Sequence, residues 1–284
     1  MIGLLHFQAN GVDYVVIEGG RGAAHDEIGQ LSAAVGIVTC ILPEHLSRLG
    51  PTMAELCADK FSLNTHCAAL LCSEQAFACA RACALPLELL HMVEAVQAAP
   101  AAGRERPAWL ALSHALALAA LARFGLAAPA QLPGAAAAAS CQRLDAALAP
   151  VLAPGELVFL DGAVSADCLD LDYMQSACCR PAAIVTGMTA DKDVAGLLAV
   201  LTAHGFTTQY HFAPTSACGH VAPPAALAWS GRFDTAGGLD AASGAALLAL
   251  LRRHRRVYLI GVQVFLRSVR NFLGVERLAG DAGA

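Results

Sequence analysis

Two polar side chains that could bind a cation follow two apolar runs near the start of the sequence. Glu18 follows the run Val12–Ile17, and His45 comes shortly after the run Val35–Leu42. Short apolar runs rich in β-branched residues are typical of parallel strands that are covered on both faces. Because the carboxyl ends of parallel strands meet at one edge of a sheet, these two side chains could face one ligand. Carboxylate oxygens and imidazole nitrogens both coordinate divalent ions, so Glu18 and His45 are candidate metal ligands.

A glycine-rich segment lies directly after Glu18. Gly19, Gly20 and Gly22 carry no side chain, so backbone N–H groups in this segment could approach an anion closely. Each polar residue also has a structural interpretation, since Glu18 could cap a helix and His45 could hydrogen-bond a backbone carbonyl. The residues alone leave both interpretations open.

The composition excludes several classes of protein. Of the 284 residues, 57% are hydrophobic and 14% are charged, whereas disordered chains combine low hydrophobicity with high charge. A net charge of −5 without a basic stripe disfavours nucleic-acid binding. The longest apolar stretch, 109–128, is interrupted by polar side chains, which indicates a buried helix rather than a membrane span. The 11 cysteines have no paired metal-ligand spacing and no signal peptide precedes them, which predicts a cytoplasmic location.

Strand and helix patterns alternate along the chain. We expect strands at 12–17, 35–42, 157–160, 182–186, 207–212 and 257–260, and helices at 74–98, 107–125, 167–178, 193–204, 240–254 and 263–273. A further helix is expected to begin at Thr52, which has capping-box spacing to Glu55. Such alternation predicts an α/β protein with open parallel sheets. The Pro/Gly/Ala stretch Ala127–Ala139 is aperiodic, so we expect two domains, 1–128 and 151–284, joined by a linker at 129–150.

The segment Val12–Leu63 resembles the central domain of folylpolyglutamate synthases and, more broadly, of the Mur ligase superfamily. Those enzymes carry a Glu-x-Gly-x-Gly-Gly-Arg-x-Asp signature after a strand, and this chain has Glu-Gly-Gly-Arg-Gly-Ala-Ala-His-Asp over residues 18–26. They next carry a strand ending in Asp-His, a Leu-Gly-x-Thr motif and a lysine, which match residues 44–45, residues 49–52 and Lys60.

Weaker matches continue in the second half of the chain. Residues 160–163, Leu-Asp-Gly-Ala, resemble the start of the family's Asp-Gly-Ala-His-Asn-Pro loop, and residues 187–193 resemble its Gly-Met-x-x-Asp-Lys-Asp segment. The resemblance therefore covers nearly the whole chain. It implies a truncated Mur-ligase-like central domain with a parallel sheet, followed by a Rossmann-like C-terminal domain.

The resemblance also implies an activity. Enzymes of this family are ATP-dependent, ADP-forming ligases that join a small-molecule acid to an amine through an acyl phosphate. The residues that match Glu18 and His45 bind Mg²⁺ in the family, and the lysine that matches Lys60 is carbamylated. By the same resemblance, Asp161 and the glycine loop, with Gly20 and Gly22, would contact ATP.

The sequence departs from the family at the nucleotide site. The family's P-loop, Gly-Thr-x-Gly-Lys-Gly-Ser, occurs nowhere in the 284 residues. Ala24 and Ala135 stand where the family has arginines, and residues 164–166 replace His-Asn-Pro. We therefore expect the chain alone to hydrolyse ATP poorly or not at all. Either a protein partner supplies the P-loop half, or a homo-oligomer forms, or the chain is an inactive pseudoenzyme that acts as a scaffold or binding module.

Overall fold

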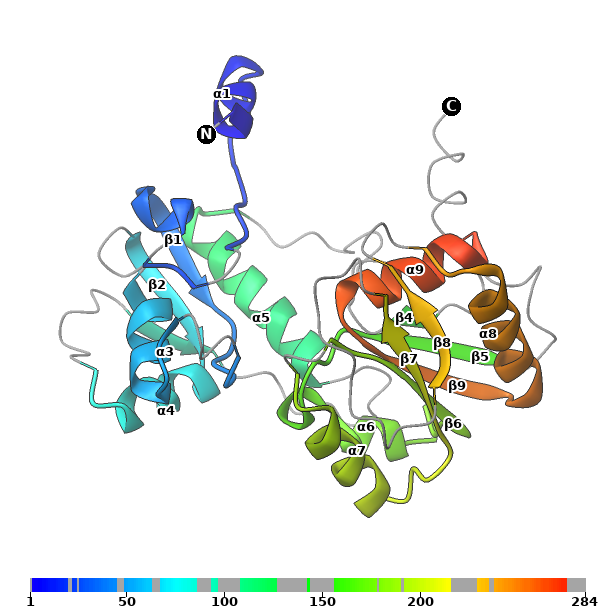
Figure 1. Cartoon of the computed structure of the whole chain (residues 1–284). Helices are drawn as coiled ribbons and strands as arrows, with labels where there is room; N and C mark the ends of the chain where they lie inside the picture. Colours follow the sequence, from blue (N-terminus) through cyan, green and yellow to red (C-terminus); the bar gives the residue numbers. More distant parts are fainter. Residues whose placement is uncertain are drawn as a thin grey trace. The chain divides into compact units, whose positions relative to one another are not determined.

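The computed structural model divides the chain into two compact units (Figure 1). The first unit comprises residues 1–99 and 111–128, and the second comprises residues 100–110 and 129–284. The structure describes residues 2–19, 22–24, 26–44, 49–62, 67–85, 93–96, 108–126, 142–143, 156–177, 179–189, 192–215, 229–234 and 238–274. Each unit contains a sheet of parallel strands with helices, which confirms the predicted α/β class.

The first unit is built on a three-stranded parallel sheet with the order β1-β2-β3. Its strands are β1 (Ala33–Val38), β2 (Cys67–Ser73) and β3 (Val93–Val96). Its described helices are α1 (Ile2–Ala9), η1 (Glu27–Gln30), α3 (Met53–Phe61), α4 (Glu74–Ala82) and most of α5 (Ala108–Arg123). The central strand β2 has five consecutive buried residues, the pattern of a strand covered on both faces. The expected strand 35–42 is confirmed in part as β1, which begins two residues earlier and ends at Val38.

Helix α3 begins at a capping box, as its sequence predicts. The Thr52 hydroxyl accepts a hydrogen bond from the Glu55 N–H, and the Glu55 carboxylate accepts one from the Thr52 N–H. These bonds satisfy backbone donors that the first helical turn leaves without partners. The apolar face of α3, with Leu56 and Phe61, packs into the core that Leu70 of β2 and Ala76 of α4 also form.

Two expectations for the first unit are wrong. Val12–Ile17 forms no strand in the described structure, because no neighbouring strand there supplies hydrogen-bond partners. Its large apolar side chains are therefore exposed, and Val16 reaches 97% exposure. The expected helix 74–98 ends at Ala82, and residues 93–96 form β3 instead. Pro86 disfavours helical backbone at the residue before it, and the valines at 93 and 96 favour a strand.

The second unit is built on a six-stranded sheet with the order β4-β5-β9-β6-β7-β8. Its strands are β4 (Gln142–Arg143), β5 (Leu157–Asp161), β6 (Ala183–Gly187), β7 (Gln209–Pro214), β8 (Trp229–Phe233) and β9 (Arg256–Gly261). Only β4 runs antiparallel to its neighbour. Its described helices are η4 (Ala166–Cys168), α6 (Leu171–Gln175), α7 (Val194–Ala203), α8 (Ala241–Arg253) and α9 (Gln263–Leu273).

The expected strands of the second unit agree with β5, β6, β7 and β9 to within two residues. The sequence did not predict β8 or β4. Of the expected linker 129–150, the structure describes only the two residues of β4, which pair with Leu160 and Phe159 of β5. The expected helix 167–178 is broken into η4 and the single turn and a half of α6.

Helices cover both faces of the larger sheet. One face packs against α8 and α9 in a core that contains Leu160, Val185 and Leu259, and the other packs against α6 and α7 in a core that contains Phe159, Ile184 and Tyr258 (Figure 1). Alternate residues of each strand thus enter different cores, as the pleat requires. In the described part of the chain, no helix combines the length and the apolarity that crossing a membrane requires.

Candidate functional site

The glycine loop of the first unit is held by a buried carboxylate, Asp59 of α3. The Ala23 N–H donates to Asp59 Oδ2 at 2.8 Å, and the Ala24 N–H donates to Asp59 Oδ1 at 3.3 Å. Asp59 is only 7% exposed, so these two hydrogen bonds replace water at its oxygens. The loop does bind an anion in this structure, and that anion is a side chain of the same protein.

Gly22 is required for this contact. Its φ angle is +77°, in the left-handed region, and a Cβ atom there would overlap the Asp59 carboxylate and Leu49. A side chain at position 22 would therefore both strain the backbone and displace Asp59. The prediction that Gly22 contacts a nucleotide stays a prediction, and Gly20 lies outside the described residues.

No sequence motif singles out Asp59, although one local signal could have indicated it. A carboxylate in the last turn of a helix opposes the helix dipole, and aspartate is a poor helix former. Asp59 lies in the last turn of α3, so a tertiary role should have been suspected. Its neighbour Lys60 is partly exposed in the same turn, where a positive charge is favourable. The carbamylation of Lys60 stays a prediction.

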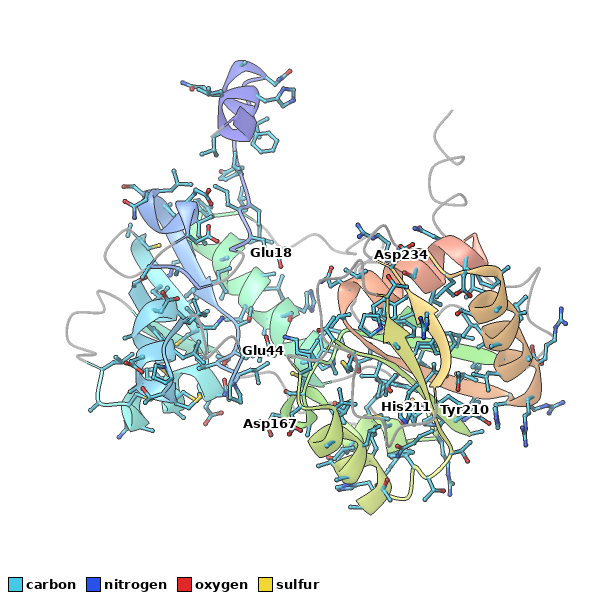
Figure 2. The ribbon with its side chains drawn as sticks, in the orientation of Figure 1. Glu18, Glu44, Asp167, Tyr210, His211 and Asp234 are labelled. Carbon is cyan, nitrogen blue, oxygen red and sulfur yellow. The ribbon has the colours of Figure 1, made fainter. Side chains whose placement is uncertain are left out.

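The described residues do not test whether the two predicted metal ligands, Glu18 and His45, lie close together. Glu18 is exposed and follows the unpaired segment 12–17, so no strand end fixes its direction. His45 lies outside the described residues, and Figure 2 shows its neighbour Glu44 apart from Glu18 within the first unit. Among the residues that the structure describes, no group of three His, Cys, Asp or Glu side chains could hold a metal ion. The pairing of Glu18 with His45 thus stays a prediction.

Asp161 ends β5 and is 2% exposed, with both carboxylate oxygens engaged by its own chain. The Tyr258 hydroxyl donates to Asp161 Oδ2 at 2.6 Å, and the Ala163 N–H donates to Oδ1 at 2.9 Å. Burial raises the pKa of Asp161 from 3.8 to about 6, because desolvation outweighs the two hydrogen bonds that favour the charged form. Tyr258 is itself fixed by packing against Phe159, with ring centroids 5.7 Å apart. Nucleotide contact by Asp161 stays a prediction.

Three polar side chains, Asp161, Thr186 and His211, lie in one row across the larger sheet, with the apolar Ile260 between Asp161 and Thr186. The register places Asp161 opposite Ile260, Ile260 opposite Thr186, and Thr186 opposite His211. Thr186 Oγ1 and His211 Nδ1 are 2.6 Å apart, and burial lowers the pKa of His211 (Figure 2). The row lies near the carboxyl ends of parallel strands, the edge at which ligands bind in open α/β sheets.

Solved structures of folylpolyglutamate synthases share this fold. The chain matches the apo enzyme of L. casei at 18% identity over 96% of this chain and 69% of that chain, with a TM-score of 0.58. It matches the Mycobacterium tuberculosis enzyme complexed with ADP and AMPPCP at 18% identity, with 95% and 70% coverage and a TM-score of 0.59. E. coli FolC in complex with DHPP and ADP matches at 18% identity, with 96% and 67% coverage and a TM-score of 0.55.

No protein-family model and no curated protein sequence matches the chain. The solved structures establish that the chain has the two-domain α/β fold of folylpolyglutamate synthases.

Replacing Asp59 by asparagine should loosen the glycine loop. The amide keeps one acceptor oxygen but turns an NH₂ group toward a backbone N–H, and an unsatisfied buried donor costs about 1–3 kcal/mol. Asp59→Asn should therefore lower the free energy of unfolding by that amount and speed hydrogen exchange at residues 22–24. The matched control is Asp13→Asn, at an exposed aspartate of the same unit. Unchanged exchange in Asp59→Asn would show that the carboxylate does not hold the loop.

Asp161 should make folding stability depend on pH. Its folded pKa of about 6 exceeds its ordinary value of 3.8, so the folded protein binds more protons than the unfolded chain between these values. Stability should therefore fall as pH rises through this window, by an amount on the order of 3 kcal/mol at about 1.4 kcal/mol per pKa unit, and change no further above it. Asp161→Asn should remove this fall in denaturant unfolding measured from pH 4 to 8.

The control for this pH series is Asp167→Asn, at an exposed carboxylate six residues further along the chain (Figure 2). It should keep the full pH dependence of the unmodified protein. An equal pH dependence in Asp161→Asn and in the unmodified protein would contradict the raised pKa.

Proposed function

We propose that this chain is a partner-dependent subunit of an ATP-dependent, ADP-forming ligase that joins a carboxylic acid to an amine. The observation that supports this proposal is the match of both units, in one order and over about 95% of the chain, to folylpolyglutamate synthases. Two of these relatives were solved with ADP bound, which supports a nucleotide as ligand. The sequence patterns around Glu18, Lys60 and Asp161 occur in the order of that family.

The proposed reaction has two steps. A substrate carboxylate attacks the γ-phosphorus of ATP, which forms an acyl phosphate and releases ADP, and an amine then displaces the phosphate. Phosphoryl transfer depends on positioning and on neutralising charge at the transferred group. We assign the positioning of the glycine loop to Asp59, and we keep Glu18 and His45 as the proposed Mg²⁺ ligands and Lys60 as the proposed carbamylated residue.

The proposed partner is a second polypeptide that carries a P-loop. No P-loop motif occurs in the 284 residues, and the apolar side chains of Val12–Ile17 are 38–97% exposed where the structure gives their exposure. The strand β1 is also at the edge of its sheet, with Ile37 39% exposed. Unpaired backbone with β-branched side chains is a template for a strand of another chain. Pairing with such a strand would turn Val12–Ile17 into a strand and give Glu18 a fixed direction.

A second candidate function is that of an inactive scaffold. This function is favoured by two carboxylates, Asp59 beside the glycine loop and Asp161, itself a predicted nucleotide contact. Both are buried and hydrogen-bonded to their own chain. Under this hypothesis the chain keeps the ligase fold and binds a partner, but its polar residues serve only stability. A homo-oligomer is the corresponding alternative for the partner.

The activity should require both polypeptides. The chain would be assayed for ADP release with glutamate and candidate acids, alone and with a P-loop protein that co-purifies with it. We expect release only from the mixture, and a loss of more than about tenfold in Glu18→Ala and in His45→Ala, the least that removing a residue supporting a metal usually costs. Asp167→Asn, at an exposed carboxylate of η4 outside the proposed interface, is the control and should keep full activity.

Three other outcomes of this assay would contradict the proposal. Full turnover by the chain alone would exclude partner dependence. Joint activity that both substitutions leave unchanged would exclude Glu18 and His45 as ligands. A stable complex whose activity is unchanged by every substitution would favour the scaffold function.

The segment Val12–Ile17 should be the site of assembly. Val16 is 97% exposed, so Val16→Lys should change the stability of the chain alone by no more than about 0.5 kcal/mol. Burial of a lysine beneath a partner strand is costly, so the same variant should weaken binding to the P-loop protein by more than about tenfold. Calorimetric titration with the P-loop protein would measure the affinity of Val16→Lys and that of its control, Ala78→Lys, at an exposed position of α4. Equal affinities in the two variants would place the interface elsewhere.

A further inference from the structure

Three cysteines gather where α3 packs against α4 in the first unit. Cys57 of α3 is fully buried, and Cys79 and Cys83 lie in α4 and at its C-cap, where both are partly buried. The Cys83 thiol donates to Cys57 Sγ across 3.6 Å, and Gln75 Nε2 donates to Cys79 Sγ at 3.3 Å. No sequence motif assigns these thiols a role. Among the described residues, no group of three or more His, Cys, Asp or Glu side chains could hold a metal ion.

We propose that Cys57 and Cys83 form a reversible disulfide that joins α3 to the end of α4. The two sulfur atoms are 3.6 Å apart and a disulfide needs about 2.05 Å, so closure requires an approach of roughly 1.5 Å. Rotation of two side chains can supply most of this distance, and Cys83 lies at a helix end rather than inside a helix. Cys79, by contrast, is held by the Gln75 amide, which itself is hydrogen-bonded to Ile41.

A small disulfide such as oxidised glutathione is the proposed oxidant. The Cys83 thiolate attacks one sulfur of that disulfide, which forms a mixed disulfide and releases one glutathione thiolate. The Cys57 thiolate then attacks the Cys83 sulfur, and the second glutathione thiolate leaves. The two protein thiols lose two electrons and two protons, and the released thiolates take up the protons as two molecules of reduced glutathione.

The order of these steps follows from exposure. Cys83 is partly exposed and can meet the oxidant, whereas Cys57 is fully buried. Burial, and to a smaller extent the hydrogen bond and the charge of Cys83, raise the pKa of Cys57 to about 12. Little thiolate is therefore present at Cys57, and we expect the second step to take minutes to hours.

The cross-link would act on the helix that carries the candidate site. Cys57 precedes Asp59 by two residues on α3, and Asp59 holds the glycine loop through the Ala23 and Ala24 N–H groups. A disulfide that fixes α3 to α4 also constrains the unfolded chain between residues 57 and 83, so it should raise the denaturation midpoint of the first unit. This inference does not depend on the proposed ligase activity.

The test uses the whole chain and its tryptic peptides. Trypsin cuts after Arg48, Lys60, Arg81 and Arg104, so Cys57 and Cys83 fall in separate peptides, 49–60 and 82–104, that contain no other cysteine. The chain is incubated with oxidised glutathione, its remaining thiols are alkylated, and it is digested without reduction. We expect the two peptides to appear joined, lighter by two hydrogen atoms than their sum, and to separate after treatment with dithiothreitol.

Variants make the result specific. Cys83→Ser should abolish the joined peptide, Cys57→Ser should trap glutathione on Cys83, and the control Cys72→Ser, at a buried thiol of β2, should leave the joined peptide in place. The oxidised chain should also unfold at a higher denaturant concentration than the reduced chain. A joined peptide that contains residues 61–81, or glutathione adducts without any cross-link at the same oxidant concentration, would overturn the proposal.

Discussion

The two hydrogen bonds from Ala23 and Ala24 to Asp59 are the interaction on which the first unit's candidate site depends. They join the glycine loop to helix α3, and other contacts fix both where this helix begins and how it packs. The capping box at Thr52 fixes where α3 begins, and the packing of Leu56 and Phe61 fixes how it lies on the sheet. The loop therefore takes its position from the core of the unit. Any ligand of its N–H groups must replace a carboxylate that the core holds in place.

The free energy needed to displace Asp59 limits the affinity that the chain alone can have for an anion. A hydrogen bond to a charged group contributes about 1.5–3 kcal/mol, and a phosphate that displaced Asp59 would first lose that amount for each bond it broke. Asp161 has the same property in the second unit, since Tyr258 and the Ala163 N–H already occupy both of its oxygens. Both side chains thus have hydrogen-bond partners within the chain, although burial disfavours the charged form of Asp161. Under the proposed function, affinity for a nucleotide would come from groups outside these two contacts, which agrees with the proposed need for a partner.

The sequence predicted the elements whose signals are local, and it failed where contacts are distant. The strands β5, β6 and β9 contain continuous apolar runs, and the capping box spans only Thr52–Glu55, so both can be recognised within a short window. Asp59 contacts residues 35 and 36 positions away, and Asp161 contacts Tyr258 at a separation of 97, so no local pattern reveals either pair. The run 12–17 shows the limit most clearly, because its composition favours extended backbone, but only a neighbouring strand can make it part of a sheet.

The difference between a ligase subunit and a scaffold therefore reduces to the state of one segment. Val12–Ile17 has no neighbouring strand in the described part of the chain, so no strand pairing orders the exposed carboxylate of Glu18. Under the proposed function, a metal ion gains less from an oxygen ligand that must be ordered on binding, because that ordering costs conformational entropy. In the proposed complex, a partner strand would pair with the segment, so that entropy would be lost in assembly rather than in metal binding and Glu18 would be a preorganised ligand. Under this proposal, assembly and metal affinity are linked, because each favours the same ordered state. The proposed role of Glu18 in metal binding therefore depends on the partner surface that orders it.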